Sequence, residues 1–151
     1  MIYKITISVL GSNFYPEQAA NHAVGGFIVK DIHAPSDIRP QIGDRYDFGS
    51  ISFWHQNEFS TEDRVANYET DIVDFLVTNQ RLFSDQGADE FHLFYEIYYS
   101  EGQCNFEILN SKLIKMMSSM HISLPVSVYR LDVDELADWE REINERWHGA
   151  D

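Results

Sequence analysis

Alternating apolar and polar positions identify the first strand of the chain. In residues 2–10, Tyr3, Ile5, Ile7 and Val9 share one side, and polar residues take most of the other. A period of two is typical of a strand with one buried face, so we expect the odd positions to face the core. Apolar and aromatic runs bounded by turn residues predict further strands over residues 27–32, 46–55, 91–100, 104–109 and 124–131.

A helical spacing of apolar residues is clearest in residues 67–83. Tyr68, Ile72, Phe75 and Leu76 follow one another at i, i+4, i+7 and i+8, which places them on one face of a helix. Acidic residues in the first turn complement the helix dipole. The same reasoning predicts helices over residues 16–23, about 111–121 and about 133–147.

These elements predict an α+β fold in the order β-α-β-β-α-β-β-α-β-α. We expect a mixed, mostly antiparallel sheet with helices packed on one face. Prolines and a glycine predict a loop from residue 33 to residue 44. A length of 151 residues fits one domain. We therefore expect a single domain over residues 1–151 that ends in an acidic helix, at about residues 133–147.

Composition and charge narrow the class of protein. A hydrophobic fraction of 44% is too high for a disordered chain. The net charge of −14 argues against binding to nucleic acid, because phosphate contacts need clustered Lys and Arg. It also argues against binding to an anionic membrane surface. Cys104 is the single cysteine, which excludes an intramolecular disulfide and a cysteine-rich zinc site.

The first residues do not resemble a secretory signal. They lack a basic segment, a long apolar run and a small-residue cleavage site. No stretch reaches the roughly 20 apolar residues that cross a bilayer. We therefore expect a cytoplasmic protein without a membrane partner, in which Cys104 is reduced.

The negative charge is concentrated in two segments. Residues 57–101 carry a net charge of −9 and residues 132–151 a net charge of −6, whereas the rest of the chain carries +1. Such a surface either keeps the protein in solution or docks a basic protein partner. In the second case, the helices over 67–83 and 133–147 could present acids together. The candidate partner-binding residues are Asp71, Asp74, Asp85, Asp89, Glu90, Asp138, Glu142 and Glu145.

Candidate catalytic residues form only weak patterns. None of the six histidines has the spacing of a metal site. His33 shares a loop with Asp37, and His55 lies near Glu58, so each pair could serve acid–base chemistry or simply lie at a surface. The Gly25-Gly26 pair either ends the first helix or lets the backbone approach a ligand. Because nucleotide-binding and nucleophile motifs are absent, we expect no cofactor.

Turn and strand-end signals give the chain a family resemblance. Residues 33–35 (His-Ala-Pro) close a strand, residues 43–44 (Gly-Asp) form a turn, and residues 53–54 (Phe-Trp) lie in the next strand. Residues 120–124 then end a helix before the strand at 126–129. In this order the chain resembles the bacterial domain of unknown function 4279 family over residues 3–131. That family has no agreed activity, so the resemblance implies an α+β fold alone.

The charge pattern favours a non-enzymatic binding protein. Its most concrete form is a bacterial immunity protein that occludes a basic toxin, such as a nuclease, by replacing nucleic-acid phosphate with carboxylates. Trp147 or Tyr68 would supply an aromatic anchor. One alternative is a small enzyme with a site at His33, Asp37 or His55, which a pocket with convergent His and Asp would favour. Another is a structural or dimerising domain, which an apolar sheet edge would favour. The oligomeric state stays open.

Overall fold

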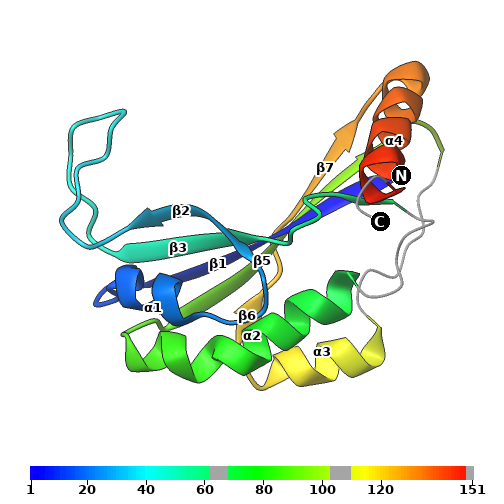
Figure 1. Ribbon diagram of the computed structural model, residues 1–151. Coiled ribbons are helices and arrows are strands. Elements are labelled where there is room, and N and C mark those ends of the chain that lie inside the picture. Colours follow the sequence, from blue (N-terminus) through cyan, green and yellow to red (C-terminus); the bar gives the residue numbers. More distant parts are fainter. Residues whose placement is uncertain (62–67, 103–109, 149–151) are drawn as a thin grey trace.

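A computed structural model describes the chain except residues 62–67, 103–109 and 149–151. Helices and strands alternate along the described residues (Figure 1). The strands are β1 (Ile2–Gly11), β2 (Ile28–His33), β3 (Gly49–Trp54), β4 (Ser60–Thr61), β5 (Glu90–Tyr99), β6 (Ile122–Ser123) and β7 (Val126–Arg130). The helices are α1 (Pro16–His22), α2 (Tyr68–Asp85), α3 (Ser111–Ser118) and α4 (Val133–His148).

The described strands form one seven-stranded sheet with β1 at its centre. The order is β2-β3-β1-β5-β6, while β4 continues beside β1 and β7 continues beside β5. Strand β1 is antiparallel to β3, β4 and β5, whereas β6 and β7 run parallel to β5. The prediction of an α+β fold with a mixed, mostly antiparallel sheet is confirmed.

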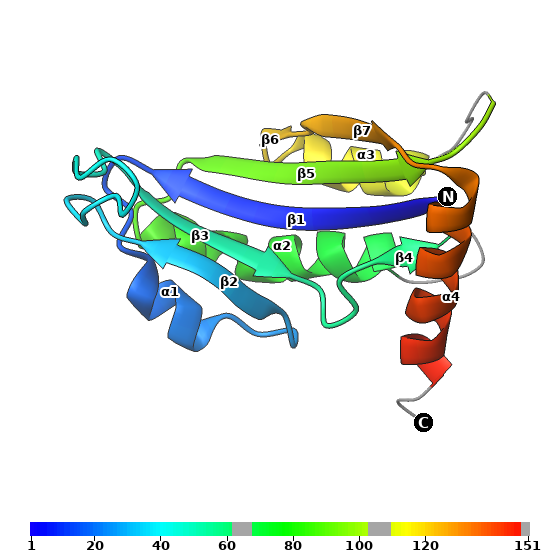
Figure 2. The same ribbon diagram turned by 90° about the horizontal axis from the view of Figure 1, so that it is seen from above.

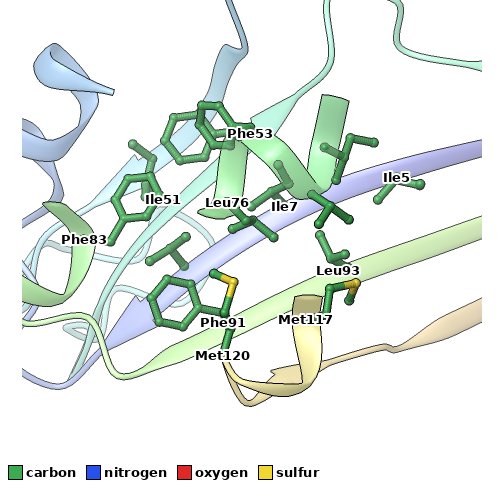
Figure 3. Packing of buried hydrophobic residues seen from close by; sticks show 14 of the residues in the cluster. Ile5, Ile7, Ile51, Phe53, Leu76, Phe83, Phe91, Leu93, Met117 and Met120 are labelled. Atoms are coloured by element: carbon green, nitrogen blue, oxygen red, sulfur yellow. The ribbon is translucent and has the colours of Figure 1, made fainter. Parts of the chain in front are cut away.

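Alternation along β1 determines the main core. Its odd side chains face helices α1, α2 and α3, which cover the same side of the sheet (Figure 1). Figure 3 shows Ile5 and Ile7 of β1 packed with Phe53 of β3 and Leu76 of α2, all of which are fully buried or nearly so. The opposite side of the sheet, which carries the even-numbered residues of β1, is therefore not covered by these three helices.

Helix α4 differs from the other three helices, because it packs on the opposite side of the sheet. Ile2, an even-numbered residue of β1, contacts a second buried cluster that contains Leu136 and Ile143. Since successive strand residues point to opposite faces, this cluster lies across the sheet from the main core. Figure 2 shows α4 lying across one end of the sheet. The expectation of helices on one face therefore holds for α1, α2 and α3 but not for α4.

Several boundaries differ from the predicted ones. The strand expected over 46–55 begins at Gly49, and the bulge of this hairpin lies at Lys30 of β2. The strand expected over 124–131 corresponds to β7, which begins at Val126 after Pro125, and the two-residue strand β6 precedes it at Ile122–Ser123. The short strand β4 was not predicted. The strand expected over 104–109 lies outside the described residues.

Candidate functional site

A cleft of about 370 Å³ opens beside helix α2. Its walls come from the connection between α1 and β2, the residues that follow β3, and the outer face of α2. Carboxylates, an imidazole, an aromatic ring and glycine backbone all line it. They include Gly25, Gly26, His55, Asp71, Asp74 and Phe75.

The periodicity of α2 brings Asp71 and Asp74 to the cleft. Ile72, Val73, Phe75 and Leu76 are buried, whereas Asp71 and Asp74 lie on the exposed side of the helix. Asp71 and Asp74 are three residues apart, which places them on the same side of the helix. Two of the eight predicted residues therefore line one cleft, and both carboxylates are exposed.

A buried imidazole points at the first of these carboxylates. Only 8% of the His55 side chain is exposed, and its ring lies between the rings of Phe27 and Tyr68 at centroid distances of 5.3 and 5.0 Å. Its Nδ1 lies within hydrogen-bond distance of both the Asn57 backbone N–H, at 3.1 Å, and the Asn57 carbonyl oxygen, at 3.3 Å; where Nδ1 accepts from the N–H, the ring proton lies on Nε2. That Nε2 lies 3.5 Å from Asp71 Oδ2. His55 thus faces Asp71 rather than Glu58, the partner that proximity in sequence suggested.

Asn79 holds the opposite wall of the cleft in place. Its side chain is 2% exposed and hydrogen-bonds both backbone groups of Val24: Oδ1 accepts from Val24 N at 3.0 Å, and Nδ2 donates to Val24 O at 2.8 Å. The next residue, Gly25, has φ of +121°, and a Cβ there would lie 3.0 Å from the ring of Phe75. The glycine therefore lets the backbone pass against α2. Helix α1 ends at His22 with Ala23 as its C-cap, so Gly25-Gly26 do not cap it, and the approach of their backbone to a ligand stays a prediction.

A buried pair of polar side chains anchors the first turn of α2 to β1. The Tyr3 hydroxyl donates to Glu69 Oε1 at 2.5 Å, and only 5% of Glu69 is exposed. Burial raises the pKa of the Glu69 carboxyl above its ordinary value, although the hydrogen bond from Tyr3 acts in the opposite direction. Burial also raises the pKa of the Tyr3 hydroxyl. This pair positions the helical turn that carries Asp71.

Glu69→Gln is expected to increase thermal stability above neutral pH. Because the pKa of Glu69 is raised in the folded protein, protonation of this carboxyl favours the fold. Its stabilising contribution is complete below the pKa of the unfolded chain and is lost as the pH rises through the folded value. Gln keeps an acceptor for Tyr3 and carries no charge. Melting curves from pH 4 to pH 8 should show that the melting temperature of the variant increases relative to that of the wild type as the pH rises. A difference in melting temperature that stays constant over this range would contradict this explanation.

A second carboxylate-lined cleft, of about 420 Å³, lies at the far end of β1. Asp89 and Glu90, at the start of β5, line it together with Asp47 and Phe48. His92 Nε2 lies 3.4 Å from Glu90 Oε2. Two more of the predicted residues are thus brought together, at a site separate from Asp71 and Asp74.

The remaining predicted residues lie apart from both clefts. Asp85 lies near Arg81 of the same helix at 3.7 Å. On α4, Asp138 contacts Arg141, and Glu142 lies 3.8 Å from Arg146. Glu145 is exposed on the same helix. Because α2 and α4 pack on opposite sides of the sheet, the two acidic helices do not form one acidic face.

The other candidate residues have structural roles. Tyr68 is 2% exposed and donates its hydroxyl to the Glu58 carbonyl, so it cannot anchor a partner. The side chain of Trp147 is not among those the structure describes. Asp37 Oδ2 accepts from the Ala34 N–H at 2.7 Å, which stabilises its own turn. His33 stacks on Tyr46 at 3.6 Å, and burial lowers the pKa of its imidazole.

Further alternatives can be examined among the described residues. No three His, Cys, Asp or Glu side chains in this part of the chain are placed to hold a metal ion. No helix in the described ranges is long and apolar enough to cross a membrane. Strand β7 exposes more than half of Val126 and Val128, which is the kind of apolar feature expected of a dimerising domain.

The fold and the clefts together define an α+β protein that presents carboxylates in separate hollows of its surface. Comparison with protein-family models, with curated proteins and with solved structures finds no match to this chain. The resemblance to the domain of unknown function 4279 family therefore stays a prediction.

Proposed function

We propose that this chain is a non-enzymatic acidic binding protein that docks a basic protein partner. In its most concrete form it is a cytoplasmic bacterial immunity protein that occludes a basic toxin such as a nuclease. One observation carries the proposal. Among the described residues, neither the Asp71–Asp74 cleft nor the Asp89–Glu90 cleft has a Lys or Arg in its lining. Asp47 of the second cleft pairs with Arg39 at 3.3 Å, whereas no Lys or Arg of the described residues lies within salt-bridge distance of Asp71 or Asp74. Uncompensated carboxylates attract cationic side chains of a partner.

The cleft brings His55 together with Asp71 and Asp74, which is the convergence of His and Asp expected of a small enzyme, but the contacts of the two histidines favour binding over acid–base catalysis. A general acid or base needs a ring nitrogen directed at the substrate. In His55, Nδ1 is occupied by the Asn57 backbone and Nε2 faces Asp71, so neither nitrogen is directed into open space. The ring of His33 is stacked on Tyr46. These contacts explain both histidines as parts of the structure.

Binding to a basic partner should weaken with salt and depend on these acids. The products of neighbouring genes are co-expressed with the protein, and any complex is measured by calorimetry at 50 and 300 mM salt. We expect a stoichiometric basic partner whose affinity falls by about tenfold or more over this range, because salt screens opposite charges. A quadruple variant that neutralises the exposed acids of both clefts, D71N/D74N/D89N/E90Q, should bind more weakly than the wild type at either salt concentration.

A matched variant separates a defined site from overall charge. It also neutralises four exposed acids, but at positions outside the predicted set: Glu17, Asp44, Glu101 and Glu135. This control should keep the wild-type affinity to within about threefold, a difference of roughly 0.7 kcal/mol. Equal losses in the two variants would reduce the effect to net charge and contradict the proposed site. An affinity that does not change with salt would contradict electrostatic docking.

A further inference from the structure

We infer that the cleft between the α1–β2 connection and α2 is a socket for a single arginine side chain of the partner. This inference rests on the proposed function and names the contact by which the partner would be anchored. A guanidinium group has five N–H donors on a planar head and an apolar stem. The cleft offers a counterpart to each of these two parts.

Aromatic rings form the apolar part of the socket. Phe27 and Phe75 lie in contact, with ring centroids 4.3 Å apart, and both line the cleft. Gly25 and Gly26 bring backbone rather than side chains to the facing wall, and nothing lies within 4 Å of a Cβ placed on Gly26. A long alkyl stem can therefore pack against the rings while its charged head stays at the rim.

Two carboxylates at the rim match the charged head. Asp71 and Asp74 are one helical turn apart, and among the described residues no Lys or Arg approaches either one within salt-bridge distance. The His55 imidazole is an independent sign that the Asp71 carboxylate is held in one orientation. His55 is more than nine-tenths buried, and its Nε2 faces Asp71 Oδ2, which leaves Oδ1 for a second donor. A guanidinium can then bind Asp71 and Asp74 with separate N–H groups.

The cleft contrasts with other hollows on the same surface. The hollow beside the loop over residues 34–47 is lined by Arg45 as well as Asp31 and Asp37, and that beside α4 is lined by Arg146 as well as Glu58. An arginine of a partner would meet a like charge in each of them. The second carboxylate-lined cleft, at Asp89 and Glu90, lacks an oriented imidazole facing its acids from a buried position, since His92 is partly exposed. The Asp71–Asp74 cleft is thus the one best built for a cationic side chain.

The test uses a small arginine probe and therefore needs no identified partner. Nα-acetyl-arginine amide is titrated into the ¹⁵N-labelled protein, and the backbone amides of Gly25, Gly26 and Thr78 are followed by NMR. We expect saturable shifts at these amides with a dissociation constant in the millimolar range. Nα-acetyl-citrulline amide has almost the same shape without the charge, and it should bind at least fivefold more weakly.

Three variants test the contact. D71N/D74N removes both charges at exposed positions and should abolish saturation, whereas D89N/E90Q removes two charges at the other cleft and should leave the titration unchanged. Thr78→Lys places an internal cation four residues after Asp74 and should compete with the probe. Saturation by citrulline with equal affinity, or by arginine in D71N/D74N, would overturn the inference.

The results separate this inference from the proposed function. If arginine saturates the cleft but no basic partner is found, the socket stands and the proposed function fails. If a basic partner binds D71N/D74N as tightly as the wild type, the proposed function stands and the socket is overturned.

Discussion

Asn79→Ala is expected to lower the free energy of unfolding by about 2–4 kcal/mol. The amide of Asn79 makes three hydrogen bonds, two with Val24 and one with the Phe75 carbonyl, while it is almost fully buried. Alanine removes all three and leaves the Val24 N–H and C=O without the partners that hold the loop. Urea unfolding followed by circular dichroism measures this loss.

The same variant should also open the cleft. Because Asn79 ties Val24 to α2, its loss releases the wall that contains Gly25 and Gly26. Hydrogen exchange of these two amides should become faster, while exchange in β1 changes only in proportion to global stability. Asn13→Ala is the control, because Asn13 is exposed and its side chain makes only a long contact with Ser12. Unchanged exchange at Gly25 and Gly26 would mean that Asn79 does not position the cleft.

Gly49→Ala is expected to lower the free energy of unfolding by about 3 kcal/mol or more. A Cβ on Gly49 would lie 1.8 Å from the Phe14 carbonyl oxygen and 3.1 Å from Pro35. Phe14 is fully buried, so its backbone cannot move away without disturbing the core. Thermal unfolding of the purified variant gives the change in stability.

Gly43→Ala separates this close approach from the general effect of losing a glycine. Gly43 has φ of +75°, and nothing lies within 4 Å of an added Cβ. Alanine there should cost only about 1–2 kcal/mol, which is the strain of a left-handed conformation. If Gly49→Ala lowered the free energy of unfolding no more than Gly43→Ala, the close approach of the Phe14 carbonyl to Gly49, the first residue of β3, would be contradicted.

Periodic segments of the sequence predicted most of the architecture. The alternation in β1 and the apolar spacing of α2 and α4 placed these elements to within two residues, because burial of one face imposes a regular pattern. Local patterns do not report which side of a sheet a helix covers. Helix α4 could be placed on the far side only through Ile2, one of two apolar residues on the mostly polar even-numbered face of β1.

The candidate site was only partly predictable. Charge alone selected Asp71 and Asp74, but grouped them with residues of α4 that lie across the sheet. The contact of His55 with Asp71 joins the end of β3 to α2, and no sequence spacing shows it. Asn79 lies in the apolar stripe of α2, and a polar residue in an apolar stripe is a signal in the sequence that it has a buried partner. Gly25-Gly26 was noted, and its place in a cleft became visible only in three dimensions.

NMR mapping of the complex with the captured basic partner tests directly whether the carboxylate-lined cleft is the docking site. The account predicts that amide shifts concentrate at residues 24–27 and 71–78, where the carboxylate-lined cleft receives the partner, with any further contact at residues 89–90. Shifts confined to β7, or to the open side of the sheet, with the cleft amides unchanged, would contradict it.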